Sequence, residues 1–458
     1  MISSTALHAL TGRIAGTVVS PADAGYDAAR RLYNAAVDVK PGAIAYCQSV
    51  ADVQATVAFA REQKLCLAVR SGGCSPTGFS TTDGLVLDVS RIDSIELAPD
   101  GKSVRIGAGA VLKSVYEALV PRGVVIPAGE CLMVGIAGLT LGGGLSLLGR
   151  SLGLTCDSLV AAEIVTAAGE ALTVHDDSHG DLFWALRGAG AGNFGVVTSL
   201  TFTVHPIPEK LLCGTVVWPL DQAAEVLHEA LDHFGNGAPD ELNSVFGLFT
   251  EKGERKLLAM PVYNGDPEAG REAMARITGL GRPATVDVEP RSFLEFLEGD
   301  FHPTGEAVYE YWKSGFADEP LDLATWKRIV EGFAASPADE AMIGVELCGG
   351  AINRVDRDAS AYVHRDQCYL FSIFADSSTA EGFAAAKAWA DQLYRLAAPS
   401  LSPARYQNYP DPSLDFYEQA YYGLHTPRLQ EVKARYDPDL LFRYEQSLRH
   451  PPAPRSPG

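Results

Sequence analysis

GECLMVGIAGLTLGGGLSLLGR, residues 129–150, is the stretch that decides how this chain is read. The run from Cys131 to Gly149 carries no charge, as a membrane span would, but six of its residues are glycine and no aromatic belt flanks it. Glycine lets backbone N–H groups approach an anion closely. We therefore interpret the stretch as a loop that cradles a phosphate group and holds one cysteine.

Two further glycine-rich stretches have the same character. RSGGC, residues 70–74, follows the apolar run LCLAV and also contains a cysteine. GAGNFG, residues 190–195, matches the GxGxxG pattern of dinucleotide folds, but a helix is predicted before it and a strand after it, the reverse of the Rossmann order. One diphosphate ligand lying across all three loops explains their shared composition.

The bulk composition limits the class of protein. A chain of 458 residues predicts two domains, and 47% hydrophobic with 21% charged residues is typical of a globular protein. The 37 basic and 57 acidic residues give a net charge of −20, which argues against nucleic acid or an anionic membrane as a partner.

Cysteine usage and the N-terminus indicate a cytoplasmic protein. The eight cysteines include no CxxC pair, so we expect neither a metal site nor a disulfide scaffold. The sequence begins without a basic segment followed by a long apolar core, so no signal peptide is predicted. The expected partners are small molecules, and the expected state is a monomer or a homodimer.

Residue patterns divide the chain into three segments. In residues 1–207, helices and strands alternate with glycine loops, whereas strand-like runs such as MIGVELCGG and YLFSIF alternate with amphipathic helices in residues 208–395. The second pattern predicts an antiparallel sheet with helices on one face. Residues 396–458 form a tyrosine-rich tail. The expected fold class is α+β, with two domains.

Five ordered motifs then point to a family. RSGGC, GECLMVGIAG, GAGAGNFGVVT, YQNYPD and YYG together resemble the FAD-linked oxidases of the vanillyl-alcohol oxidase (PCMH-type) superfamily, and most closely its berberine-bridge-enzyme-like branch. The resemblance covers nearly the whole chain. It implies a PCMH-type FAD-binding domain at 1–207, an inserted substrate-binding domain at 208–395, and a berberine-bridge-like segment at 396–458 that returns to the FAD domain.

The resemblance implies FAD as cofactor, and Cys131 matches the family cysteine that bonds the flavin. Cys74 stands where the family has a second, flavin-linked histidine. We expect Cys74 to pack against the flavin ring; a thioether from Cys74, since a thiolate is a competent nucleophile, and a link removed by engineering are the alternatives. The other residues that the resemblance assigns to FAD binding are Arg70, Ser71, Gly72, Gly73, Val134, Gly135, Gly138, Gly142, Gly143, Gly144, Leu154, Asp157, Asn193, Gly195, Val197, Asn408, Tyr409 and Tyr422.

Two residues are the candidate bases. Tyr409 of the NYPD segment matches a tyrosine that stands near the substrate in the family, and as a base it needs a phenol pKa lowered from about 10. Glu346 shares a strand face with Cys348, and it either takes a substrate proton or pairs with an arginine. Tyr309 and Tyr311 are predicted to line the pocket.

The resemblance also implies the reaction. A hydride leaves a substrate carbon for flavin N5, a base takes a proton from an attached hydroxyl, and dioxygen reoxidises the flavin and becomes hydrogen peroxide. Valine at 134 is small, which in the family is typical of access for dioxygen. The expected substrate is a hydroxyl-bearing secondary metabolite or sugar, and oxidative cyclisation is the alternative outcome. The rival functions are a flavin dehydrogenase with another acceptor and a flavin-binding protein without catalysis.

Overall fold

A four-stranded sheet near the N-terminus positions the RSGGC turn. In this computed structural model, which describes residues 2–251, 253–300, 308–338 and 340–451, the strand order is β1-β2-β4-β3, with β2, β4 and β3 parallel. Strand β3 ends at Arg70, so the turn leaves the carboxyl edge of the parallel strands. The elements are α1 (Ser4–Thr11), β1 (Thr17–Val19), α2 (Tyr26–Arg30), β2 (Ala43–Tyr46), α3 (Val50–Glu62), β3 (Leu67–Arg70) and β4 (Leu85–Asp88).

A five-stranded antiparallel sheet, in the order β5-β6-β10-β8-β9, positions the GAGNFG loop, which directly precedes β10. Helix α7 precedes the GAGNFG loop and strand β10 follows it, as predicted. The elements are β5 (Ile95–Leu97), β6 (Ser103–Gly107), α4 (Leu112–Leu119), β7 (Val124–Val125), α5 (Ile136–Leu141), α6 (Gly149–Leu152), β8 (Leu159–Thr166), β9 (Ala171–Val174), α7 (Gly180–Ala189), β10 (Gly195–Thr203) and β11 (His205–Pro206).

A seven-stranded antiparallel sheet, in the order β15-β12-β14-β13-β17-β18-β16, forms the second half of the molecule. The elements are β12 (Leu211–Pro219), α8 (Ala223–Gly235), β13 (Leu242–Glu251), β14 (Glu254–Tyr263), α9 (Pro267–Thr278), β15 (Thr285–Arg291), α10 (Phe293–Asp300), β16 (Tyr309–Ala317), α11 (Leu323–Ala334), β17 (Glu340–Leu347), α12 (Ala351–Arg354), β18 (Tyr369–Ser377) and α13 (Ala380–Ala397).

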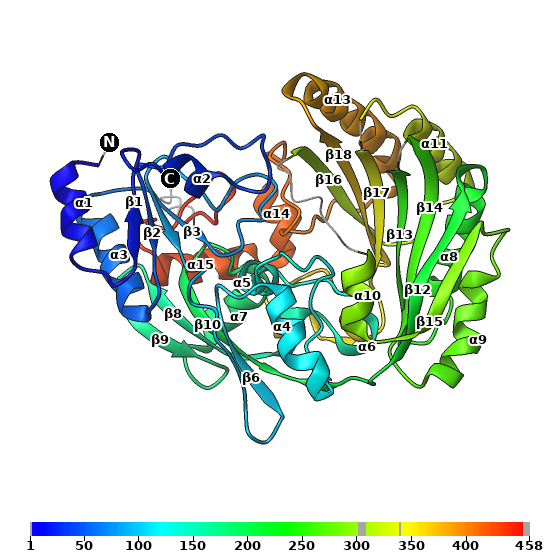
Figure 1. The fold of residues 1–458 in the computed structure, drawn as a ribbon, viewed down its shortest axis with the longest axis horizontal. Helices are drawn as coiled ribbons and strands as arrows, with labels where there is room; N and C mark the ends of the chain where they lie inside the picture. The colour runs from blue at the N-terminus through cyan, green and yellow to red at the C-terminus, as the bar shows by residue number, and fades with distance from the viewer. Residues whose placement is uncertain (1, 252, 301–307, 339, 452–458) are drawn as a thin grey trace, which may run out of the picture.

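The two faces of this sheet have different neighbours. Helices α8, α9, α11 and α13 cover its outer face, as Figure 1 shows, and Phe246, Ile343 and Phe371 pack beneath them in one apolar core. The opposite face looks toward the N-terminal half, and we call it the inner face. Strand residues two apart share a face, so the inner face of β17 carries Glu346.

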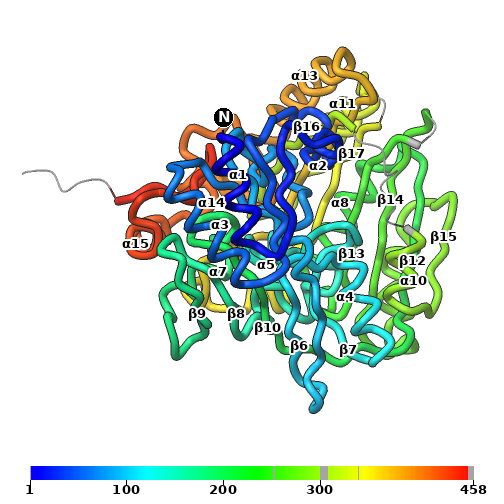
Figure 2. Tube along the Cα trace, turned by 60° about the vertical axis from the view of Figure 1, so that its left-hand side comes forward, coloured from blue at the N-terminus to red at the C-terminus, as the bar shows by residue number. Residues whose placement is uncertain are grey.

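The tail returns to the N-terminal half. Helices α14 (Tyr417–Tyr422) and α15 (Thr426–Tyr436) lead into a segment in which Phe442 forms a β-bridge with Leu67, and Figure 2 shows α15 close to α7. Lys433, which is fully buried, donates hydrogen bonds to Asn193 O, Asp437 and Phe442 O at 2.6–2.7 Å.

These observations confirm the α+β class, with helices on one face of an antiparallel sheet. The division at residues 207 and 395 remains a proposal. No helix among the described residues combines the length and the apolar character that crossing a membrane requires.

Candidate functional site

The two cysteine loops, far apart in sequence, are in direct contact. A Cβ atom added to Gly72 would lie 2.6 Å from the backbone nitrogen of Gly135, so neither loop has room for a side chain at this crossing. The Cys74 thiol donates to Gly72 O at 3.4 Å and to Met133 O at 3.7 Å. The structure therefore places Cys74 beside the loop that holds Cys131, as one ligand spanning both loops requires.

A cavity of about 290 Å³ opens along the first turn, lined by Arg70, Ser71, Gly72 and Gly73 together with Tyr33. Gly73 has φ +71°, a conformation that favours glycine. The N–H groups of Gly72 and Gly73 make no hydrogen bond to any described residue. Free amides beside a cavity form a concave site for an anion, so the turn fits the diphosphate of FAD.

The two thiols differ in their surroundings. Burial raises the pKa of Cys74 to about 11, and a single backbone N–H, that of Gly135, opposes the shift. Burial also raises the pKa of Cys131, but the nearby N–H groups of Met133 and Val134 both lower it. Both thiols are partly buried. Cys131 thus has the better stabilised thiolate.

The two candidate bases are brought together. The Tyr409 hydroxyl lies close enough to the Glu346 carboxylate to lower the carboxyl pKa, whereas burial raises it by more. Burial, followed by the Glu346 charge, raises the phenol pKa of Tyr409 well above its ordinary value. The lowered phenol pKa that a tyrosine base requires is therefore absent, and Glu346 is the better proton acceptor near neutral pH.

Glu346 makes no ion pair with an arginine among the described residues, so that alternative fails. A second carboxyl, Glu130, lies near it: burial and the charge of Glu346 raise the pKa of Glu130. Glu130 directly precedes Cys131 but was not selected in the sequence, because no motif marks it.

The predicted position of Tyr309 and Tyr311 was wrong. Both side chains point to the outer face of the sheet, where Tyr309 packs on Phe383 of α13 at 5.9 Å between ring centroids. The Tyr311 hydroxyl donates to Asp391 of the same helix at 2.8 Å. On the inner face, Trp312 instead stands edge-on to Tyr409, at 4.7 Å. Side chains alternate between the two faces of a strand, so the directions of Tyr309, Tyr311 and Trp312 follow once the packing of β16 in the sheet is known.

Several predicted FAD residues have their polar groups engaged within the protein. Arg70 pairs with Asp88 and donates to Ala29 O at 2.9 Å, and Asp157 forms a two-bond salt bridge with Arg365. The Asn193 amide donates to Ala189 O and accepts from Leu448 N, both at 2.9 Å. These side chains order the chain around the site, and their contact with FAD remains a proposal.

The triple glycine is also engaged. The N–H of Gly143 donates to Thr140 O, and that of Gly144 to the Tyr406 hydroxyl, both at 3.0 Å. Asn408 donates to Leu139 O and to the same hydroxyl at 3.0 Å. Tight packing between chain segments therefore accounts for these glycines without a ligand.

The remaining predicted residues lie along the same loops and strands. Gly142 lies against Asn408, where an added Cβ would come within 2.0 Å of the amide oxygen, and Ser71 donates to Ala108 O at 2.7 Å. Leu154 and Tyr422 are buried, Val134 is partly buried, Val197 and Gly195 lie in β10, and Gly138 lies in α5.

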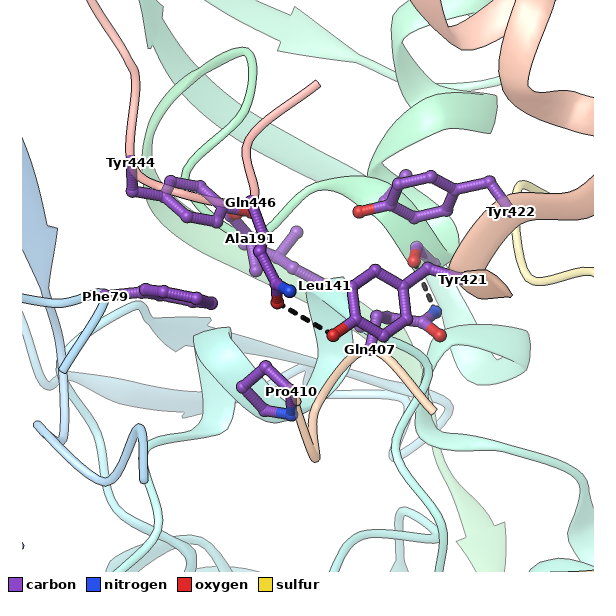
Figure 3. Close-up of a pocket in the computed structure, with 12 residues that line it drawn as sticks. Phe79, Leu141, Ala191, Gln407, Pro410, Tyr421, Tyr422, Tyr444 and Gln446 are labelled. Carbon is purple, nitrogen blue, oxygen red and sulfur yellow. Dashed lines mark hydrogen bonds between the residues drawn. The ribbon is translucent and has the colours of Figure 1, made fainter. Parts of the chain in front are cut away.

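A second, smaller cavity of about 30 Å³ lies between the tail and the glycine loops (Figure 3). Gln446 accepts a hydrogen bond from the Tyr421 hydroxyl at 2.8 Å across it, and Phe79 and Tyr444 close one side. Phe79, Tyr444 and Gln446 carried no signal in the sequence, because only the folded tail brings them to the glycine loops.

Comparison with known proteins agrees with this geometry. A family model for an FAD binding domain matches residues 41–175, and one described as berberine and berberine like matches residues 405–449. An uncharacterized FAD-linked oxidoreductase of Bacillus subtilis, YgaK, is 33% identical over 97% of this chain and 98% of its own length. A chitooligosaccharide oxidase of Gibberella zeae is 31% identical over 91% of this chain and 89% of its own.

Among solved structures, the BBE-like 1 protein of Physcomitrella patens superposes with a TM-score of 0.88 at 25% identity, covering 97% of this chain and 99% of that one. FAD is thus the cofactor, and the free amides and adjoining thiols of the two loops fit it. The chain belongs to the berberine-bridge-enzyme-like family of FAD-linked oxidoreductases.

Proposed function

We propose that the protein is an oxidase that converts a hydroxyl-bearing carbon of a small molecule, a sugar or secondary metabolite, to a carbonyl. The observation that carries the proposal is the proximity of the Tyr409 hydroxyl and the Glu346 carboxylate on the inner face, near Glu130 of the second cysteine loop. When bound, FAD supplies the acceptor for the hydride and passes both electrons to dioxygen, which becomes hydrogen peroxide.

Side chains of the protein accept the substrate proton. The substrate O–H donates its proton to the Tyr409 oxygen, while the Tyr409 proton moves to Glu346, so the tyrosine ends neutral and the glutamate ends as the acid. The raised pKa of the Glu346 carboxyl matches this task, because a base acts best when its pKa lies near the working pH. The substrate loses one hydride and one proton in total, which makes the carbonyl.

Cys131 is the proposed covalent link to FAD, and Cys74 packs beside it. The support is the pair of amides that stabilise the Cys131 thiolate, the form that bonds carbon. A covalent bond from Cys131 would fix the cofactor relative to Tyr409 and Glu346, and a fixed arrangement of reacting groups contributes a large part of the rate of such reactions.

Anaerobic stopped-flow reduction of the holoenzyme tests the proposal, with a substrate found by screening hydroxyl compounds for bleaching of the flavin. Glu346→Gln should slow reduction by on the order of 10²–10⁴-fold. Glu340→Gln is the matched control, because it lies on the same strand and face but is exposed. Equal rates for wild type and Glu346→Gln would remove the glutamate from the reaction, and slow reoxidation by dioxygen would reassign the enzyme as a dehydrogenase.

A further inference from the structure

Three acidic residues stand side by side at one end of the inner face. Glu310 of β16 lies directly opposite Asp376 of β18, which lies opposite Glu340 of β17. Directly opposed residues have Cβ atoms roughly 5 Å apart. Glu310 is only 6% exposed, Asp376 is partly buried, and Glu340 is exposed. The first two therefore form a compact, largely buried carboxyl pair.

This pair has no counter-charge in the described part of the chain. Neither residue forms an ion pair there, and Glu310 Oε2 and Asp376 Oδ1 have no hydrogen-bond partner. The nearest lysine in sequence, Lys313, points to the outer face and binds Asp411 at 2.8 Å. Burial and the charge of Asp376 raise the pKa of Glu310, and burial and the charge of Glu340 raise that of Asp376. Opposed like charges destabilise a sheet, so stability does not explain the pair.

A buried asparagine fixes Glu310 beside the flavin turn. Asn34, 2% exposed, donates from its side chain to Glu310 O at 2.8 Å and to Pro76 O at 2.7 Å. The Glu310 N–H donates back to Asn34 Oδ1 at 3.1 Å. Pro76 follows Cys74 by two residues, so the carboxyl pair is anchored next to the turn that is proposed to hold FAD.

Aromatic side chains connect the carboxyl pair to the proposed bases. Trp312 follows Glu310 on the same face, about 6.8 Å along the strand. Its ring stands edge-on to Phe374 at 4.6 Å and to Tyr409 at 4.7 Å between centroids. Aromatic rings next to unpaired carboxylates are the surroundings in which an ammonium group and its carbon skeleton bind favourably.

We infer that Glu310 and Asp376 bind a positively charged nitrogen of the substrate, while Trp312 and Phe374 hold its carbon skeleton against Tyr409. The substrate class is an alcohol or phenol that carries a protonated amine. The identity of the reaction rests on the proposed function, but the binding of the cation does not depend on turnover.

Equilibrium binding to the anaerobic holoenzyme tests the inference. Two matched pairs of probes are titrated and followed by flavin absorbance or calorimetry: tyramine against 4-propylphenol, and glucosamine against glucose. In wild type, the amine of at least one pair should bind roughly 10–100-fold more tightly than its neutral partner, the factor expected for charge-assisted hydrogen bonds. In the double variant Glu310→Gln/Asp376→Asn, that preference should fall to about 1.

Glu340→Gln is the control, since it removes one charge of the same row at an exposed position. It should keep the preference; an equal loss would assign the effect to the net charge of −20 and overturn the inference. Absence of a preference for either amine in wild type would also overturn it, whether or not a hydroxyl compound reduces the flavin.

Thermal unfolding separates a ligand site from a structural one. Because the pair has no counter-charge among the described residues, and only the Trp312 side chain opposes the raised pKa of Glu310, the double variant should unfold at the same or a higher temperature at pH 8. A lower temperature together with an unchanged amine preference would make the pair structural. A preference that depends on Glu310 and Asp376, with no compound reducing the flavin, would support the cation site and reject the proposed oxidase.

Discussion

Arg365 binds Asp157 with both terminal nitrogens, at 2.8 and 2.7 Å, and both side chains are largely buried, at 3% and 12% exposure. Asp157 also accepts the Leu154 N–H at 2.9 Å. The pair joins the glycine-loop region to the segment before β18, so it crosses the boundary that the sequence predicts between the FAD and substrate domains.

Asp157→Asn should lower the free energy of unfolding by about 3–5 kcal/mol, because removing one partner leaves the buried guanidinium uncompensated. Urea denaturation of the holoprotein measures the change. Arg357 and Asp366 form a matched exposed pair, at 44% and 61% exposure. Asp366→Asn should therefore cost less than about 1 kcal/mol. Similar losses of unfolding free energy in Asp157→Asn and Asp366→Asn would show that the buried pair stabilises the fold no more than the exposed pair does.

Gly72→Ala should reduce the flavin content of the purified protein. The new Cβ would lie 2.6 Å from Gly135 N and 3.0 Å from its Cα, both backbone atoms, so the two cysteine loops would have to separate. Overpacking of this kind costs typically 1–3 kcal/mol. The ratio of flavin to protein absorbance measures the effect, and Gly180→Ala, where the added Cβ meets nothing within 4 Å, should leave it unchanged. Full flavin content in Gly72→Ala would show that the crossing relaxes without cost.

Local signals in the sequence were sufficient for many of the elements. Ser49 caps the N-terminus of α3 and accepts the Asp52 N–H at 3.2 Å, and a serine three residues before an acidic residue is a capping signal that is visible in the sequence. The face of the short strand with Glu346 was also predicted correctly, because alternation within one strand needs no partner.

Contacts between distant strands were not predictable in the same way. The run VYEYW places large side chains on both faces of a strand, so its pattern does not show which set of side chains faces the pocket. Glu310 and Asp376 meet only through the pairing of β16 with β18, and nothing near either residue in the sequence indicates that register.

Glycine patterns were similarly ambiguous. Gly73 and Gly143 both have positive φ, at +71° and +117°. The amide of Gly73 is free at a cavity, whereas a Cβ on Gly143 would lie 2.7 Å from the Tyr362 ring. The sequence does not distinguish a glycine that lets a ligand approach from a glycine that neighbouring chain segments require for lack of space, so the structure is needed to tell them apart.

The carboxyl pair should make stability depend on pH. Burial and the charge of Asp376 raise the pKa of Glu310 to about 8 in the folded protein, above its unfolded value near 4. The folded state therefore binds more protons in the interval between the two values, and stability falls as pH rises through it. Glu310→Gln should match wild type in melting temperature near pH 4 and exceed it increasingly toward pH 8.

Exposed Glu340→Gln should show a much smaller difference, because solvent screens its charge. Wild type melting above Glu310→Gln at pH 8 would contradict the assignment of an uncompensated carboxyl.

The attachment of FAD is decided by the two thiols. Cys131→Ser should release all FAD when the protein is denatured, whereas Cys74→Ser should retain it, because only Cys131 has two backbone amides that stabilise its thiolate. Intact mass of the denatured protein measures attachment, and peptide mapping identifies the modified residue. Cys66→Ser, on a partly buried cysteine before β3, controls for general effects of losing a thiol. Flavin recovered on a peptide containing Cys74, or retained by Cys131→Ser, would show that the first turn forms a thioether as well.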